Sequence, residues 1–138
     1  MSAKQAVIDT NVLVAAGINP SGKPGQVLAA VERLELQPVI STDVIAEYRD
    51  VLTRAHFRFQ SEWVHRLLEN FELLGLRLEP PPIDTAGLPD PTDAPFIALA
   101  RYAGCPVITG NVKHFPAAAG MVVLTPAGWV ESSIRQPL

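Results

Sequence analysis

The hydrophobic residues of this chain fall into short runs, and most of these runs are followed by a longer segment of mixed polarity. Four runs are rich in valine and isoleucine, and they cover residues 6–9, 38–40, 106–109 and 121–124. Runs of this length and composition predict short strands that are buried on both faces of a sheet. Residues 76–79 alternate between apolar and charged side chains, which predicts one more strand.

The segments between these strands repeat apolar residues at intervals of three and four, which predicts helices. The predicted helices cover residues 24–36, 43–54, 61–74 and 93–103, with a short helix after residue 11 and another from 125 to 129. Short strands that alternate with longer helices are typical of an α/β fold with a parallel sheet covered on both faces. The 138 residues are expected to form a single domain, residues 1–138.

Composition narrows the class of protein. Hydrophobic residues make up 48% of the chain and the formal net charge is −3, so we expect a globular protein without an overall basic surface for nucleic acid. The apolar runs are shorter than the ~18 residues that a membrane helix needs, and the first residues do not resemble a signal peptide. With a single cysteine, Cys105, these features predict a cytoplasmic protein without a disulfide framework or a membrane partner.

Positive charge is concentrated in one part of the chain. Between residues 49 and 66 lie Arg49, Arg54, His56, Arg58, His65 and Arg66. This concentration has two interpretations: solvated faces of two helices, or a surface that contacts phosphates or a partner protein.

One carboxylate interrupts the first apolar run. Asp9 follows Val7 and Ile8, so it is expected where a buried strand ends and the chain turns. A bare carboxylate in such a place is costly unless another group compensates its charge. Ligands of parallel sheets bind at the carboxyl ends of the strands, so Asp9 is the first candidate for chemistry.

Two further acids are candidates for the same place. Glu47 lies three residues after Val44 and four before Val51, so it falls on the apolar stripe of its helix; an ion pair with an arginine is the ordinary alternative. Asp93 begins a helix, where an aspartate often serves as a cap.

If Asp9, Glu47 and Asp93 converge, a divalent cation would relieve the repulsion between their carboxylates, and oxygen ligands favour Mg²⁺ or Mn²⁺. Such a centre can activate water for phosphodiester hydrolysis.

Four segments together resemble a known family. They are residues 8–14, 41–47, 90–100 and 107–115, in this order. With them the chain resembles a PIN-domain protein, of the kind found as the VapC-type toxin of toxin–antitoxin pairs. The resemblance implies a three-layer α/β/α fold with a central, mostly parallel sheet, and a Mg²⁺- or Mn²⁺-dependent ribonuclease.

The resemblance also assigns roles to residues. Asp9, Glu47 and Asp93 match the first three metal-binding acids of the family, whereas Asn111 and His114 stand in the two settings where a fourth acid is expected. Asn111 would offer an oxygen or orient water, and His114 would contact a phosphate or carry a proton. Neither brings a negative charge, so we expect at most one strong metal site.

Three other residues are expected to support these groups. Asp90 would help to compensate for the missing acid, although its ordinary role is that of a turn residue before a proline. Thr10 and Thr109 would support the acids through their hydroxyl groups, although they also suit a turn and a strand end.

The expected partners are an RNA substrate, a small antitoxin and a second copy of the chain in a homodimer. The surface near residues 42–74 is the candidate for the dimer or antitoxin contact. Two alternative functions remain open: a PIN-fold module that binds RNA or protein with weak or lost nuclease activity, and a non-toxin nuclease of RNA processing.

Overall fold

Five parallel strands form the centre of the structure, a computed structural model that describes residues 4–115 and 120–135. The strands are β1 (Lys4–Ile8), β2 (Leu36–Ile40), β3 (Leu76–Arg77), β4 (Val107–Ile108) and β5 (Val123–Leu124). They form one sheet in the order β3-β2-β1-β4-β5, and all four pairings are parallel. The predicted sheet is therefore confirmed, although β3, β4 and β5 are shorter than the apolar runs suggested.

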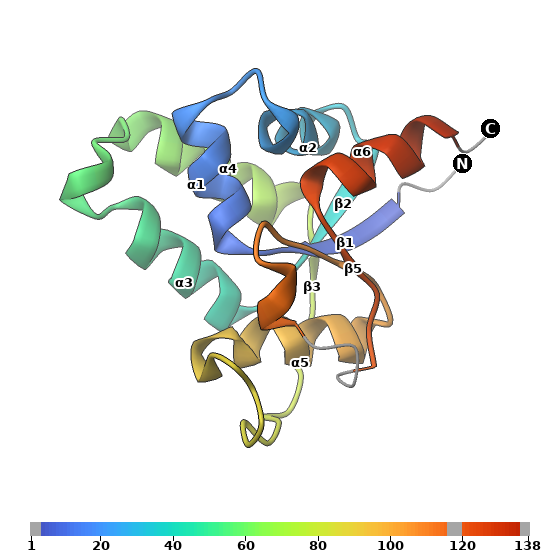
Figure 1. The fold of residues 1–138 in the computed structure, drawn as a ribbon. Helices are drawn as coiled ribbons and strands as arrows, with labels where there is room; N and C mark the ends of the chain where they lie inside the picture. Colours follow the sequence, from blue (N-terminus) through green and yellow to red (C-terminus); the bar gives the residue numbers. More distant parts are fainter. Residues whose placement is uncertain (1–3, 116–119, 136–138) are drawn as a thin grey trace.

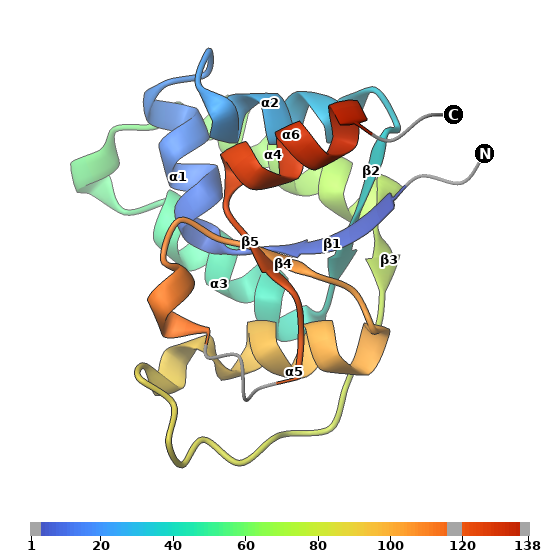
Figure 2. The ribbon, with the colours of Figure 1, turned by 45° about the vertical axis from the view of Figure 1, so that its right-hand side comes forward.

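Helices cover both faces of this sheet. They are α1 (Thr10–Ile18), α2 (Lys23–Glu32), α3 (Thr42–Leu52), α4 (Ser61–Leu74), α5 (Ala94–Ala103) and α6 (Pro126–Arg135), with the 3₁₀ helices η1 (Ala55–Phe57), η2 (Pro91–Asp93) and η3 (Val112–His114). Helices α2 and α6 pack together on one side of the sheet, and α5 lies on the opposite side, against β1 and β2 (Figures 1 and 2). The three-layer α/β/α fold is confirmed.

The strand order reverses direction at the centre of the sheet. From β1 the chain moves outward to β2 and β3, and it then returns to the other side of β1 to form β4 and β5. Ile8 pairs with Ile108, so Asp9 and Thr109 leave neighbouring strands side by side. Ligands of open parallel sheets bind at such a reversal point. The topology thus places Asp9 at the position where a site is expected.

A helix was predicted over residues 24–36, and its predicted C-terminal end is wrong. Helix α2 ends at Glu32, and Leu36 already belongs to β2, where it is buried. Leu34 lies within the predicted helix, but its φ is +63° and it is 65% exposed. The chain makes a left-handed turn here, and this turn starts the strand earlier than the helical spacing suggested.

Helix α4 matches its predicted bounds, and Gly75 ends it. The backbone of Gly75 is extended rather than left-handed, with a φ of −78°. A Cβ atom at this position would collide with the carbonyl oxygen of Phe71 in α4 and would lie 2.9 Å from the carbonyl oxygen of Pro38 in β2. Glycine is therefore needed because the backbone at the end of α4 is crowded by its own last turn and by the sheet. Within the described part of the chain, no helix is long and apolar enough to cross a membrane.

Candidate functional site

Asp9 connects the central strand to the first helix. It is the N-cap of α1, and its Oδ1 atom accepts a hydrogen bond of 2.8 Å from the Thr10 N–H. Its Oδ2 atom accepts a 2.8 Å hydrogen bond from the Thr109 hydroxyl group. Only 7% of the residue is exposed, and this burial raises the pKa of Asp9 against the lowering effect of the two hydrogen bonds. The carboxylate is thus oriented on both oxygens while its charge remains costly.

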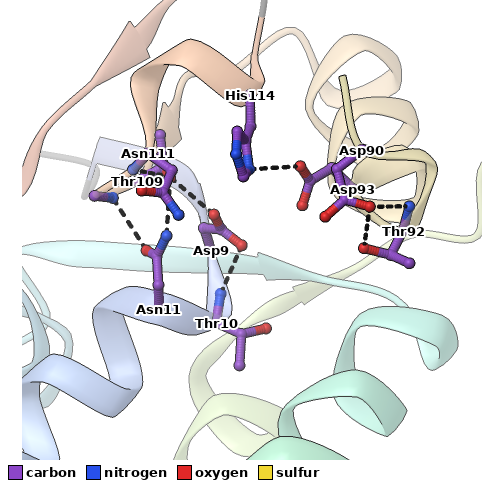
Figure 3. A network of polar contacts seen from close by, with 10 residues as sticks. Asp9, Thr10, Asn11, Asp90, Thr92, Asp93, Thr109, Asn111 and His114 are labelled. Carbon is purple, nitrogen blue, oxygen red and sulfur yellow. Dashed lines mark hydrogen bonds and ion pairs between the residues drawn. The ribbon is translucent and has the colours of Figure 1, made fainter. Parts of the chain in front are cut away.

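A network of amides and hydroxyls holds the loop after β4 against α1 (Figure 3). Asn11 accepts a 3.0 Å hydrogen bond from the Gly110 N–H and donates a longer one, of 3.4 Å, to the Thr109 hydroxyl oxygen. The Asn111 N–H donates to the same oxygen at 2.9 Å. We call Asp9, Thr10, Asn11 and Thr109 the β1 half of the site. Asn11 was not predicted from the sequence, where its only signal is an amide close to the acid in an otherwise mostly apolar run.

The two threonines support Asp9 in different ways. The expected hydroxyl hydrogen bond is present at Thr109. It is absent at Thr10, whose buried hydroxyl oxygen has no hydrogen-bond partner among the described residues. Thr10 instead contacts Asp9 through its backbone N–H, because Asp9 is the cap of the helix that Thr10 begins. The hydroxyl hydrogen bond expected of Thr10 is therefore not observed among the described residues.

Asp93 is the second buried carboxylate. It lies at the end of η2, directly before α5, and is 9% exposed. Its side chain makes no capping hydrogen bond to α5, so the ordinary role of a helix-start aspartate is not observed. Its Oδ2 atom lies 3.4 Å from Nδ1 of His114, and no hydrogen bond reaches this buried oxygen from the described part of the chain.

The pKa of Asp93 is raised to about 6. Burial is the largest cause, the negative charges of Asp9, Asp90 and Glu47 add to it, and His114 opposes it. These couplings indicate that the four acids act on one region of space. A group of carboxylates that raise one another's pKa is the electrostatic condition that a divalent cation relieves.

Asp90 has an ordinary structural role beside its place near the site. Its Oδ1 atom accepts hydrogen bonds from the Thr92 N–H at 3.0 Å and from the Thr92 hydroxyl at 2.7 Å, as expected of a turn residue. These bonds lower the pKa of Asp90. Single ligand atoms of Asp90, Asp93 and His114 all lie within 4.8 Å of one another. We call these three residues the α5 half of the site.

Glu47 and Asn111 complete the predicted set. Glu47 is half-buried on α3, and within residues 4–115 and 120–133 no arginine or other cation pairs with it, so the alternative of an ion pair is not observed. Asn111 is exposed and contributes its backbone N–H to Thr109. The structure thus brings Asp9 and Asp93 together (Figure 3), places Glu47 near enough for its charge to raise the pKa of Asp93, and leaves Asn111 exposed.

A separate cavity of about 500 Å³ lies away from the acids. Residues of α1, α2 and α4 line it, together with Phe59 and Trp63, whose ring centroids are 5.2 Å apart. Arg58 and Arg66 line it. Arg54, His65 and Arg66 of the same basic stretch each pair with an acid four residues away in the sequence. We call this cavity the α1–α4 groove. The basic stretch is therefore partly a solvated helix face and partly the border of a groove.

Comparison with known proteins identifies the family. A model of the PIN domain matches residues 5–113. The chain belongs to the PIN-domain family. The match includes Asp9, Glu47, Asp93 and Asn111, and it ends one residue before His114. No curated protein sequence gives a significant match.

Several solved structures share the fold of this PIN domain. PAE2754 from Pyrobaculum aerophilum has a TM-score of 0.62 and 19% identity, over 99% of this chain and 100% of that one. VapBC-1 from nontypeable Haemophilus influenzae has a TM-score of 0.56 and 20% identity, over 89% and 98%. FitAB bound to the IR36 DNA fragment has a TM-score of 0.55 and 20% identity, over 88% and 94%. At these identities the likeness is one of fold.

Proposed function

We propose that this PIN domain is a ribonuclease that depends on Mg²⁺ or Mn²⁺ and acts as the toxin of a toxin–antitoxin pair. One observation carries the metal-dependent part. The buried Oδ2 atom of Asp93 has no hydrogen-bond partner in the described part of the chain, and the negative charges of three other acids raise the pKa of this residue. A buried carboxylate oxygen needs a compensating partner, and a cation would provide it.

Asp9, Glu47 and Asp93 would hold the ion. All three offer carboxylate oxygens, which suit hard cations such as Mg²⁺ and Mn²⁺. When bound, such an ion compensates the clustered charge and lowers the pKa of water for attack on a phosphodiester. The unpartnered oxygen of Asp93, and the absence of an ion pair at Glu47 among the described residues, fit this assignment.

The surrounding residues would position the acids and the substrate. Thr109 and the Thr10 N–H fix both oxygens of Asp9. Asn111 and His114 lie on the loop that follows β4, so they are placed to orient water, contact a phosphate or carry a proton. No part of this scheme requires a covalent intermediate.

Partners follow from the same assignment. The similar folds of VapBC-1 and FitAB support a small antitoxin, and we place its contact on the surface of residues 42–74, where the α1–α4 groove combines aromatic side chains with Arg58 and Arg66. A partner segment with apolar and acidic side chains would complement this groove. We further propose a homodimer and a cytoplasmic location.

The decisive experiment is RNA cleavage by the purified, chelator-treated chain. We expect no cleavage without metal, recovery with Mn²⁺ or Mg²⁺, and no recovery in Asp9→Asn. Asp43→Asn, which changes an exposed acid on α3, is the matched control and should cleave normally. Cleavage that survives both chelation and Asp9→Asn would overturn the proposal.

The exposed amide at the position of the fourth acid favours a second candidate, a binding module with weak or lost activity. Such a module would retain labelled RNA without cutting it and would show little affinity for Mn²⁺.

Expression in cells separates a toxin from a nuclease of RNA processing. A toxin arrests growth, and co-expression of a small partner protein relieves the arrest.

A further inference from the structure

Three side chains at one edge of the site have ligand atoms without a hydrogen-bond partner among the described residues. Both side-chain hydrogen bonds of Asp90 fall on its Oδ1 atom, and Oδ2 of Asp93 is buried and accepts none. Nδ1 of His114 faces this oxygen (Figure 3). Asp90 directly precedes η2, Asp93 ends η2 and His114 ends η3. One ligand atom of each residue lies within 4.8 Å of the other two.

The spacing of His114 and Asp93 suits two ligands of one ion. Their facing atoms, Nδ1 and Oδ2, are 3.4 Å apart, and no hydrogen bond forms between them in the described structure. Nitrogen and oxygen ligands about 2.1 Å from one tetrahedral ion lie about 3.4 Å from each other. Asp93 is also nine-tenths buried, so its bare oxygen is a costly feature without a cation.

We propose that Asp90, Asp93 and His114 form a second cation site, which selects Mn²⁺, Co²⁺ or Zn²⁺ over Mg²⁺. Imidazole nitrogen suits these ions, whereas Mg²⁺ is held by oxygen alone. Two carboxylates and a neutral imidazole carry two negative charges, which a divalent ion neutralises. The inference deepens the proposed function and rests on it only in that Asp93 is shared with the site of Asp9 and Glu47.

This second site replaces the missing fourth acid by nitrogen. Asp93 has two oxygens, so it can face both ions, as bridging carboxylates do in two-metal nucleases, where the ions lie about 3.5–4 Å apart. His114 is 41% exposed, so a coordination position remains open to water or a phosphate. For ions that accept nitrogen, the proposal therefore differs from the sequence-based expectation of at most one strong site.

Pulsed electron paramagnetic resonance of Mn²⁺ tests the site directly, because a coordinated imidazole gives a ¹⁴N modulation. The chain has three histidines, His56, His65 and His114, and the first two are exposed on other elements. We expect the modulation in the wild type, in His56→Asn and in His65→Asn, and its loss in His114→Asn. Absence of the modulation in the wild type, or its persistence in His114→Asn, would overturn the inference.

A second variant keeps a ligand while it removes the nitrogen. His114→Asp supplies a fourth acid, so we expect it to bind Mn²⁺ without ¹⁴N modulation and to lose at least about tenfold in its preference for Mn²⁺ over Mg²⁺, measured by competition titration. An unchanged preference would count against the nitrogen site. Circular dichroism of each variant confirms that it is folded, and a misfolded His114→Asn leaves His114→Asp to decide.

The failure of this inference is distinguishable from the failure of the proposed function. In Asp9→Asn the first site is lost, but the ¹⁴N modulation should remain. A modulation without RNA cleavage would support the second site and overturn the nuclease. Cleavage that depends on Asp9, without any modulation, would support the nuclease and overturn the second site.

Discussion

The two halves of the site bury their carboxylates to a similar degree, but they differ in the hydrogen bonds that these carboxylates accept. Asp9 is 7% exposed and Asp93 is 9% exposed. Both oxygens of Asp9 accept hydrogen bonds from neutral donors, whereas Oδ2 of Asp93 has only the distant imidazole of His114. The pKa of both acids is raised, and that of Asp93 reaches about 6.

The difference shows that equal burial can serve two purposes. In the β1 half, strand pairing and helix capping fix the acid before any ligand arrives, which is the preorganisation that a site requires. In the α5 half, Asp93 is buried without a hydrogen-bond donor to its Oδ2 atom among the described residues. The folded chain therefore retains the electrostatic cost of this buried charge, which a cation can remove. The following predictions test whether this division is real.

The largest effect is expected at Asp9. Asp9→Asn keeps a side-chain acceptor at the N-cap of α1 but removes the charge, so RNA cleavage should fall more than about 100-fold while the metal-free melting temperature does not fall. Asp9→Ala should lose activity equally and also lose about 0.5–2 kcal/mol of stability with the cap. Equal melting temperatures for the two variants would show that the cap contributes nothing.

Thr109 carries the next largest effect, because its hydroxyl group forms hydrogen bonds with Asp9, Asn11 and Asn111. Thr109→Val removes the donor to Asp9 and the acceptor of the Asn11 and Asn111 bonds. We expect a loss of about 1–3 kcal/mol in the free energy of unfolding and of about 10- to 100-fold in cleavage rate.

Two matched variants control this result. Thr109→Ser retains the hydroxyl group and should restore most of the activity. Thr53→Val removes an exposed hydroxyl at the end of α3 and should leave cleavage unchanged. If Thr109→Ser is as inactive as Thr109→Val, the methyl packing of Thr109 matters and the polar network does not.

The α5 half predicts a dependence of stability on pH. The folded pKa of Asp93 is about 6, above its ordinary value of 3.8, so between these values the folded chain binds more protons than the unfolded chain. Raising the pH through this window in the absence of metal should therefore lower the free energy of unfolding, by about 1–2 kcal/mol after screening by solvent.

Denaturant unfolding at pH 4.5 and pH 7 in a chelator measures this effect. Asp93→Asn should flatten the dependence, and Mn²⁺ should restore stability to the wild type at pH 7 by binding only the folded chain. A pH dependence that is the same in Asp93→Asn would assign it to other groups and remove the contrast between the halves.

Sequence alone predicted the part of the site that depends on local pattern. An apolar run that ends in Asp9, followed by a helix, sufficed to place the acid at the carboxyl edge of a parallel sheet. The bond from Thr109 to Asp9 joins residues 100 positions apart, and it depends on the register in which Ile8 pairs with Ile108. No local pattern encodes this register.

The facing of His114 and Asp93 was unpredictable for a related reason. It requires the turn of η3 to bring the loop after β4 over the start of α5. At Leu34 the prediction failed for a local reason. The helical spacing continues past the end of the helix, and the left-handed turn at Leu34 is seen only in the backbone of the structure. Periodicity thus predicts the elements well, whereas contacts between loops need the tertiary structure.

The smallest effect is expected beneath the β1 half. The buried hydroxyl of Tyr48 donates a 2.6 Å hydrogen bond to the carbonyl oxygen of Ile8, and the ring packs edge-on against Phe71. Tyr48→Phe leaves this carbonyl without that donor, which should cost about 1 kcal/mol of stability. Tyr102→Phe, at an exposed position, is the control and should cost nothing measurable.

The effect of Tyr48→Phe on cleavage decides what holds Asp9 in place. If the hydrogen bonds from Thr10 and Thr109 suffice, the rate should fall by less than about threefold, because the acid keeps both of its donors. A fall as large as that of Thr109→Val would mean that the buried layer under β1 positions the carboxylate. The β1 half would then be preorganised by its core rather than by its polar network.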